Sequence, residues 1–203
     1  MKQYYLKKTL GILKKEYPNL TDIELDEYRY GLEGFYLTIT KSLVIVPTAF
    51  ILGIGKELLI MFILFNILRK YACGLHATKS WICLFSSSMI FLTLPFLAKN
   101  IVIPIQIKII LGIIAILVFL VYAPADTKKA PIIYKEKREK KKFIATILCI
   151  IFMICCILIS DNTISNLILF SACIETIMIL PITYHMFHLP YNNYKNYVMR
   201  YNT

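Results

Sequence analysis

Charged residues are scarce in this chain of 203 residues. They make up 17% of the sequence, whereas hydrophobic residues make up 58%, and the mean hydropathy is +0.65. Average globular proteins carry about a quarter charged residues. The composition therefore excludes an ordinary soluble domain and predicts an integral membrane protein with a single helical domain.

Patterns typical of metal sites and disulfide frameworks are also missing. The sequence has no Cys-x-x-Cys pair and no Cys and His cluster at zinc-binding spacing. Its apolar segments lack the clustered acids of metal-dependent lipid or prenyl-peptide enzymes. Most of the cysteines lie in apolar runs, where they are expected to be small, reduced, buried hydrophobes. They are Cys149, Cys155, Cys156 and Cys173.

The N-terminus lacks the uninterrupted apolar core of a signal peptide. Instead, apolar residues recur at helical spacing among lysines, at Leu6, Leu10, Leu13 and Tyr17. This pattern predicts a basic amphipathic helix on the inner membrane surface, ending at Pro18. The sequence Thr21-Asp22-Ile23-Glu24 is a capping box, which predicts the start of a second helix.

Six apolar segments follow, and a membrane-spanning helix needs about 20 apolar residues. They are Leu32–Leu52, Leu58–Leu68, Trp81–Leu97, Ile101–Ala123, Phe143–Ser160 and Ile164–Phe187. The second is short, so we expect it to be tilted, broken or partly inserted. The predicted fold is all-α, with about six transmembrane helices. Residues 1–31 form a cytoplasmic amphipathic segment, 32–187 the transmembrane domain and 188–203 a cytoplasmic tail.

Lysine and arginine predict the orientation in the membrane. The N-terminal segment holds six of them and the stretch Lys128–Lys142 holds eight, whereas the loops near Lys56, Lys99 and Asp161 hold two between them. Both termini are therefore expected on the cytoplasmic side, together with the segment from Arg69 to Cys83. The net charge is +11, and the charged residues lie between apolar spans. This distribution favours anionic lipid or an acidic peptide over nucleic acid as the partner.

The interiors of the predicted spans contain the charged residues Lys41, Lys108 and Glu175. Such residues are candidates for function, and they would serve a non-enzymatic transporter or export component. A structural interpretation is also open. The two lysines can extend to the interface, and Glu175 can be the partner of one of them.

The polar stretch Arg69–Cys83 interrupts two apolar runs and contains His76, Cys73 and Cys83. A thiolate can attack a carbonyl carbon while an imidazole takes and returns the proton. On one continuous helix His76 and Cys83 would be about 10 Å apart along the axis, too far for a hydrogen bond. A working pair therefore requires a break in the helix, which Gly74 permits.

Thr78 or Ser80 would then cap the next helix. With Ser80 as the cap, Cys83 lies in the first turn, where the helix dipole and Lys79 favour a thiolate. Cys73 is the competing thiol, three residues before His76. Packing or solvated groups near a membrane interface remain the alternative interpretation, because a His and a Cys at this spacing form a weak pattern alone.

Several motifs resemble the accessory gene regulator B (AgrB) family of membrane cysteine peptidases, which process quorum-sensing propeptides. They are Tyr30-Gly31-Leu32-Glu33, Arg69-Lys70-Tyr71 followed by Gly74-Leu75-His76-Ala77 and Cys83, and Tyr122-Ala123-Pro124-Ala125-Asp126-Thr127-Lys128-Lys129-Ala130-Pro131. The resemblance extends over essentially the whole chain. It departs at Cys73, where many members carry a small residue.

The resemblance implies a cysteine endopeptidase of the cytoplasmic membrane of a Gram-positive bacterium, with its active site facing the cytoplasm. The implied substrate is a small AgrD-like propeptide with an amphipathic leader and an acidic C-terminal tail. Cys83, activated by His76, would cleave off the tail through a thioester acyl-enzyme and give a cyclic thiolactone or lactone. No metal or organic cofactor is expected, and the resemblance suggests a homodimer.

Further residues are assigned to substrate binding. Arg69, Lys70 and Lys79 would bind the acidic tail or polarise the carbonyl. The basic loop 124–142, with Lys128 and Lys129, would dock the tail, or it is simply a topological anchor touching anionic lipid. Asp126 would either orient His76 or pair with Lys128.

Overall fold

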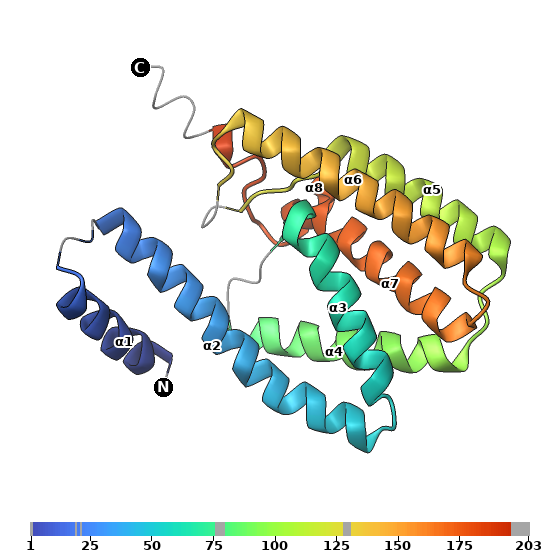
Figure 1. Ribbon diagram of the computed structural model, residues 1–203, viewed down its shortest axis with the longest axis horizontal. Helices are drawn as coiled ribbons and strands as arrows, with labels where there is room; N and C mark the ends of the chain where they lie inside the picture. The colour runs from blue at the N-terminus through green and yellow to red at the C-terminus, as the bar shows by residue number, and fades with distance from the viewer. Residues whose placement is uncertain (1, 19, 21, 76–79, 128–130, 196–203) are drawn as a thin grey trace.

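The computed structural model describes residues 2–18, 20, 22–75, 80–127 and 131–195 (Figure 1). These residues form eight α-helices, with one isolated β-bridge between Cys73 and Ala125. The helices are α1 (Lys2–Glu16), α2 (Asp22–Ile51), α3 (Gly55–Ala72), α4 (Ser80–Asn100), α5 (Ile105–Tyr122), α6 (Lys135–Leu158), α7 (Asn162–Ile179) and α8 (Pro181–Met186). The predicted all-α fold is confirmed.

Five helices of the described chain are long and apolar enough to cross a membrane. They are α4, α5, α6, α7 and the Gly31–Ile51 part of α2. The remaining predicted segment, the second, lies on α3 and is the one that was expected to be short. Helix α3 has 18 residues but carries two charges at each end, including Lys56 and Arg69. Its apolar stretch is therefore shorter than the helix itself.

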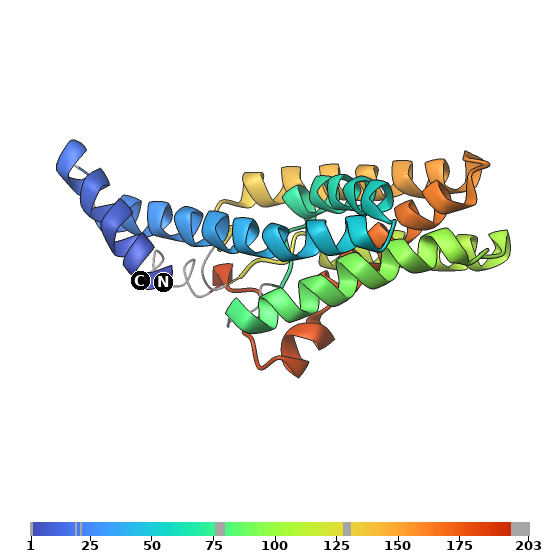
Figure 2. The ribbon, with the colours of Figure 1, turned by 90° about the horizontal axis from the view of Figure 1, so that it is seen from below.

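Helix α7 lies at the centre of the bundle and packs against α3, α4, α5 and α6. Helices α5 and α6 lie side by side at one edge, and α1 and α2 lie at the other (Figure 1). Most long helices follow the long axis of the molecule, whereas α3 is inclined steeply across it (Figures 1 and 2). The main core is apolar and includes Leu68, Phe119, Cys149 and Leu169, all fully buried.

The N-terminal helices follow the predicted pattern with one difference. Helix α1 ends at Glu16, just before Pro18. Leu6 on its apolar face is buried, and Tyr5 packs its ring 5.5 Å from that of Tyr36 on α2. The second helix does not stop at the membrane boundary. It continues into the first span as a single helix of 30 residues.

Two helix boundaries in the C-terminal half of the chain also differ from those expected. The basic stretch expected in a loop is helical from Lys135, because Lys, Glu and Arg are good helix formers and Lys135 pairs with Glu139 one turn later at 3.9 Å. The last predicted span is divided at Leu180, where Pro181 begins α8. Proline has no N–H to continue the hydrogen bonds of α7.

Candidate functional site

The segment after α3 makes the turn that the sequence predicted. Helix α3 ends at Ala72, and the next two residues, Cys73 and Gly74, have φ of 63° and 95°. The Gly74 N–H donates to the carbonyl of Ala125 at 2.6 Å, and the Leu75 N–H donates to that of Met178 at 3.0 Å. The turn is therefore held from one side by the segment after α5 and from the other by the end of α7.

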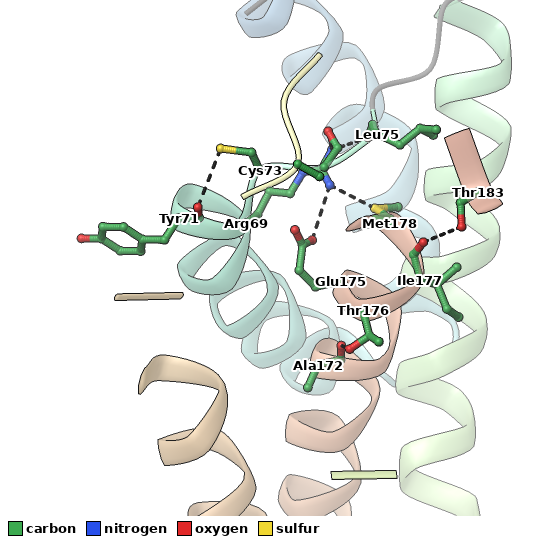
Figure 3. A network of polar contacts seen from close by, with 12 residues as sticks. Arg69, Tyr71, Cys73, Leu75, Ala172, Glu175, Thr176, Ile177, Met178 and Thr183 are labelled. Atoms are coloured by element: carbon green, nitrogen blue, oxygen red, sulfur yellow. Dashed lines mark hydrogen bonds and ion pairs between the residues drawn. The ribbon is translucent and has the colours of Figure 1, made fainter. Parts of the chain in front are cut away.

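Arg69 joins this turn to α7 (Figure 3). Its guanidinium forms an ion pair with the fully buried Glu175 at 3.5 Å, and it lies 3.4 Å from the sulfur of Met178. The same group donates to the carbonyl oxygens of Gly74, at 3.1 Å, and of Leu75. Arg69 is thus a structural link between α3, the turn and α7, and it also lines the cavity described next.

A cavity of about 420 Å³ opens between α2, α3 and α4. Most of its lining is apolar, as expected inside a membrane, and Phe62, Phe65 and Phe91 form part of its wall. Cys83, near the start of α4, is one of the lining residues and is 6% exposed. The Lys41 ammonium from α2 donates to the Cys83 sulfur at 3.5 Å.

Cys73, the competing thiol, has a different setting. Its sulfur is directed away from the Arg69–Glu175 pair in Figure 3, toward the carbonyl of Tyr71. The Lys141 ammonium of α6 donates to it at 3.3 Å. Cys73 is partly buried, and the cavity lining contains Cys83 but not Cys73. Each thiol therefore has a lysine beside it, but Cys83 is the one that faces the cavity.

Several predicted site residues lie outside the described part of the chain: His76, Lys79, Lys128 and Lys129, together with the proposed cap Thr78. Their roles stay predictions. Lys70 is described, is exposed at the end of α3, and places its ammonium 5.5 Å from the centre of the Tyr71 ring.

Asp126 fastens the segment after α5 to the C-terminal tail. Its buried carboxylate accepts backbone N–H groups from Asn193 at 2.9 Å, Tyr194 at 2.8 Å and Ile132 at 3.4 Å. Tyr184 donates its hydroxyl to the Asp126 carbonyl at 3.2 Å. Burial raises the pKa of Tyr184 above its usual value. These contacts give Asp126 a structural function, and its predicted part in catalysis or binding stays a prediction.

The intramembrane charges do not form one connected pathway among the described residues. Lys41 contacts Cys83, the buried Lys108 donates to the Ser165 hydroxyl at 2.6 Å, and Glu175 pairs with Arg69. The partner of Glu175 is therefore neither of the two lysines that the sequence offered. The contact of Lys41 with Cys83 was also missed, because the two residues are 42 positions apart.

The structure thus defines a polytopic helical membrane protein in which a thiol and an ammonium line an apolar cavity. The family model for accessory gene regulator B matches residues 4–179. The chain belongs to the accessory gene regulator B family.

Curated relatives support this assignment. The chain is 30% identical to an AgrB-like protein of Clostridium acetobutylicum, over 93% of this chain and 90% of that protein. It is 32% identical to an AgrB-like protein of Listeria innocua, over 83% of both chains. It is 35% identical to accessory gene regulator protein B of Staphylococcus aureus strain Newman, over 81% of this chain and 86% of that protein. No solved structure gives a significant match.

Proposed function

We propose that this protein is a membrane cysteine endopeptidase that removes the acidic C-terminal tail from a quorum-sensing propeptide and cyclises the remaining signal core. Cys83 is the nucleophile and His76 the general base. The observation that carries the proposal is the position of Cys83, which lines a cavity beside an ammonium in a chain of the accessory gene regulator B family.

The chemistry takes two steps. In the first, the Cys83 thiolate attacks the carbonyl carbon between core and tail. The C–N bond breaks, and the tail leaves as an amine that takes the proton held by His76. In the second, a thiol or hydroxyl of the bound peptide attacks the thioester and gives its proton to His76. The Cys83 thiolate leaves, and a thiolactone or lactone ring remains.

The apolar cavity favours cyclisation over hydrolysis. Exchange between thioesters is nearly balanced in free energy, so the outcome depends on which nucleophile reaches the acyl group first. Aromatic side chains, among them Phe62, Phe65 and Phe91, line the cavity. A site with few water molecules limits the competing attack of water.

The partners follow from the same proposal. The substrate is a small propeptide with an amphipathic leader, and its acidic tail meets the basic residues on the side of the membrane that holds the active site. Lys135, Lys137, Arg138 and further cations on the first turns of α6 supply part of this charge. The positive-inside pattern favours the cytoplasm for this side, with anionic lipid around it. The family resemblance adds a homodimer as the proposed working form.

Co-expression with the candidate acidic-tailed peptide tests the proposal. Cleavage and ring formation would be followed by mass spectrometry for wild type, Cys83→Ala, His76→Ala and Cys73→Ala. We expect Cys83→Ala and His76→Ala to abolish both products and Cys73→Ala to retain them. Membrane levels of each variant would be matched by immunoblot, so that a folding defect is not read as lost catalysis.

Other outcomes would reassign the site. Loss of cleavage in Cys73→Ala alone would make Cys73 the nucleophile, with Lys141 as its neighbouring cation. Cleavage by all variants, or none by wild type, would refute the peptidase. The transporter that depends on Lys41, Lys108 and Glu175 would then become the leading hypothesis.

A further inference from the structure

Two helices present matching polar strips to the cavity. Thr38, Lys41 and Ser42 of α2 line it at positions i, i+3 and i+4. Cys83, Ser86 and Ser87 repeat the same spacing on α4, and this spacing places side chains on one helix face. Polar groups inside a membrane are costly, so two such strips facing one cavity indicate a site rather than a packing surface.

The contact across the cavity is made by Lys41. The hydroxyls of Thr38 and Ser86 donate within their own helices, to the carbonyls of Gly34 at 2.9 Å and of Ile82 at 2.8 Å. Lys41 instead donates to the Cys83 sulfur on the other helix. Within the described residues, no carboxylate lies within ion-pair distance of Lys41.

We propose that Lys41 is the third catalytic group of this site: its ammonium holds Cys83 as a thiolate through a direct ion pair. The inference rests on the proposed function and adds to it a residue outside the Arg69–Cys83 stretch. The S–H proton passes to His76, and the sulfur keeps the electron pair that attacks the substrate carbonyl. The resulting negative sulfur is in turn the counter-ion that a lysine in this apolar setting requires.

Through this ion pair, α2 takes part in catalysis. Cys83 lies on α4 and Lys41 on α2, so the thiolate is stabilised only while these helices stay packed together. Near the start of α4 the helix dipole favours the same charge state. The ammonium adds an interaction that the helix alone cannot supply, in surroundings where charges are weakly screened.

The test measures thiol reactivity without any peptide. The full-length protein in lipid nanodiscs would be treated with iodoacetamide at pH 7, and alkylation of Cys83 would be followed by peptide mass spectrometry. The variants are Lys41→Met, Lys41→Gln, Lys41→Arg and Lys99→Met. Lys99 lies at the opposite end of α4 and donates to the Gly53 carbonyl, so its variant controls for loss of a lysine.

We expect alkylation of Cys83 to slow about tenfold in Lys41→Met and Lys41→Gln, because the thiolate is the reactive species. Lys41→Arg should retain a rate within about threefold of wild type, because it keeps the charge. Cys73 should react at an unchanged rate in every Lys41 variant, which shows that the fold is intact. Lys99→Met should leave both thiols unchanged.

Two results would overturn the inference: a wild-type rate at Cys83 in both uncharged variants, or a rate in Lys41→Arg as low as in Lys41→Met. The second would mean that lysine shape, not charge, supports the thiol. Peptide cleavage measured in parallel separates this inference from the proposed function. Slowed alkylation with a wild type that cleaves no peptide keeps the ion pair and refutes the peptidase. Normal alkylation in both uncharged variants, with a wild type that cleaves the peptide, refutes the ion pair and keeps the peptidase.

Discussion

Arg69 and Glu175 form an ion pair at 3.5 Å between the end of α3 and the middle of the bundle, with Glu175 fully buried and the Arg69 side chain 18% exposed. The pair is more than a link between two helices. Arg69 also donates to the carbonyls of Gly74 and Leu75 (Figure 3). The charge on α7 therefore fixes the turn that leads from α3 toward the helix of Cys83.

Replacing Glu175 with Gln should destabilise the protein strongly. Arg69 would lose its carboxylate partner while staying largely buried, and breaking a buried pair costs about 3 kcal/mol or more. Thermal unfolding in detergent would measure the change. The control is Glu57→Gln, which breaks the more exposed pair with Lys99 at 3.8 Å and should cost less than about 1 kcal/mol. Equal effects of the two variants would contradict a structural function for the Arg69–Glu175 pair.

Gly74→Ala should displace the turn. A Cβ at this position would lie 2.6 Å from Arg69 Nη1 and 3.0 Å from the Met178 carbonyl oxygen, at a φ of +95° that L-residues rarely adopt. We expect a loss of about 2 kcal/mol in the free energy of unfolding, together with reduced peptide cleavage. Gly34→Ala is the control, because nothing lies within 4 Å of its Cβ and alanine favours a helix. A Gly74→Ala protein as stable as wild type would show that the turn tolerates a side chain.

Asp126→Asn should loosen the C-terminal tail. The amide would place an N–H₂ group against backbone donors that now share the carboxylate, at a cost of about 2 kcal/mol. Trypsin cleavage after Lys195, followed by mass spectrometry, should become faster. Asp161→Asn is the matched control, because this N-cap accepts the Ile164 N–H at 3.0 Å and asparagine caps equally well. Unchanged cleavage in Asp126→Asn would show that the tail is held by other contacts, such as those of Tyr184.

Most of the fold was predictable because it depends on local patterns. Apolar runs located the spans, Pro18 marked the end of α1, and Gly74 marked the break after α3. The errors are equally local in origin. An apolar run ends where the chain leaves the membrane, but the helix need not end there. Helices α2 and α6 therefore extend past their apolar parts. Pro181 divides into two helices an apolar run that hydrophobicity alone predicts as one span.

The site was harder to predict because its contacts join distant segments. Cys83 could be chosen from its expected place at the start of a helix, but its lysine partner on α2 could not be identified from spacing. The strips at Thr38, Lys41 and Ser42 and at Cys83, Ser86 and Ser87 are visible in the sequence as polar i, i+3, i+4 positions within apolar spans. That signal marks two polar faces, and only the packing of α2 on α4 shows that they meet.

Helix α2 also joins the N-terminal helix α1 to the part of the bundle that holds Cys83. The helix is about 45 Å long at the usual rise per residue. Just past its C-terminal end, the carbonyl of Gly53 accepts from Lys99 at 2.7 Å, and at its middle Tyr36 contacts Tyr5 of α1. Lys41 lies five residues after Tyr36, about 7.5 Å along the helix axis, so α1 packs on the same part of α2 that carries the ammonium.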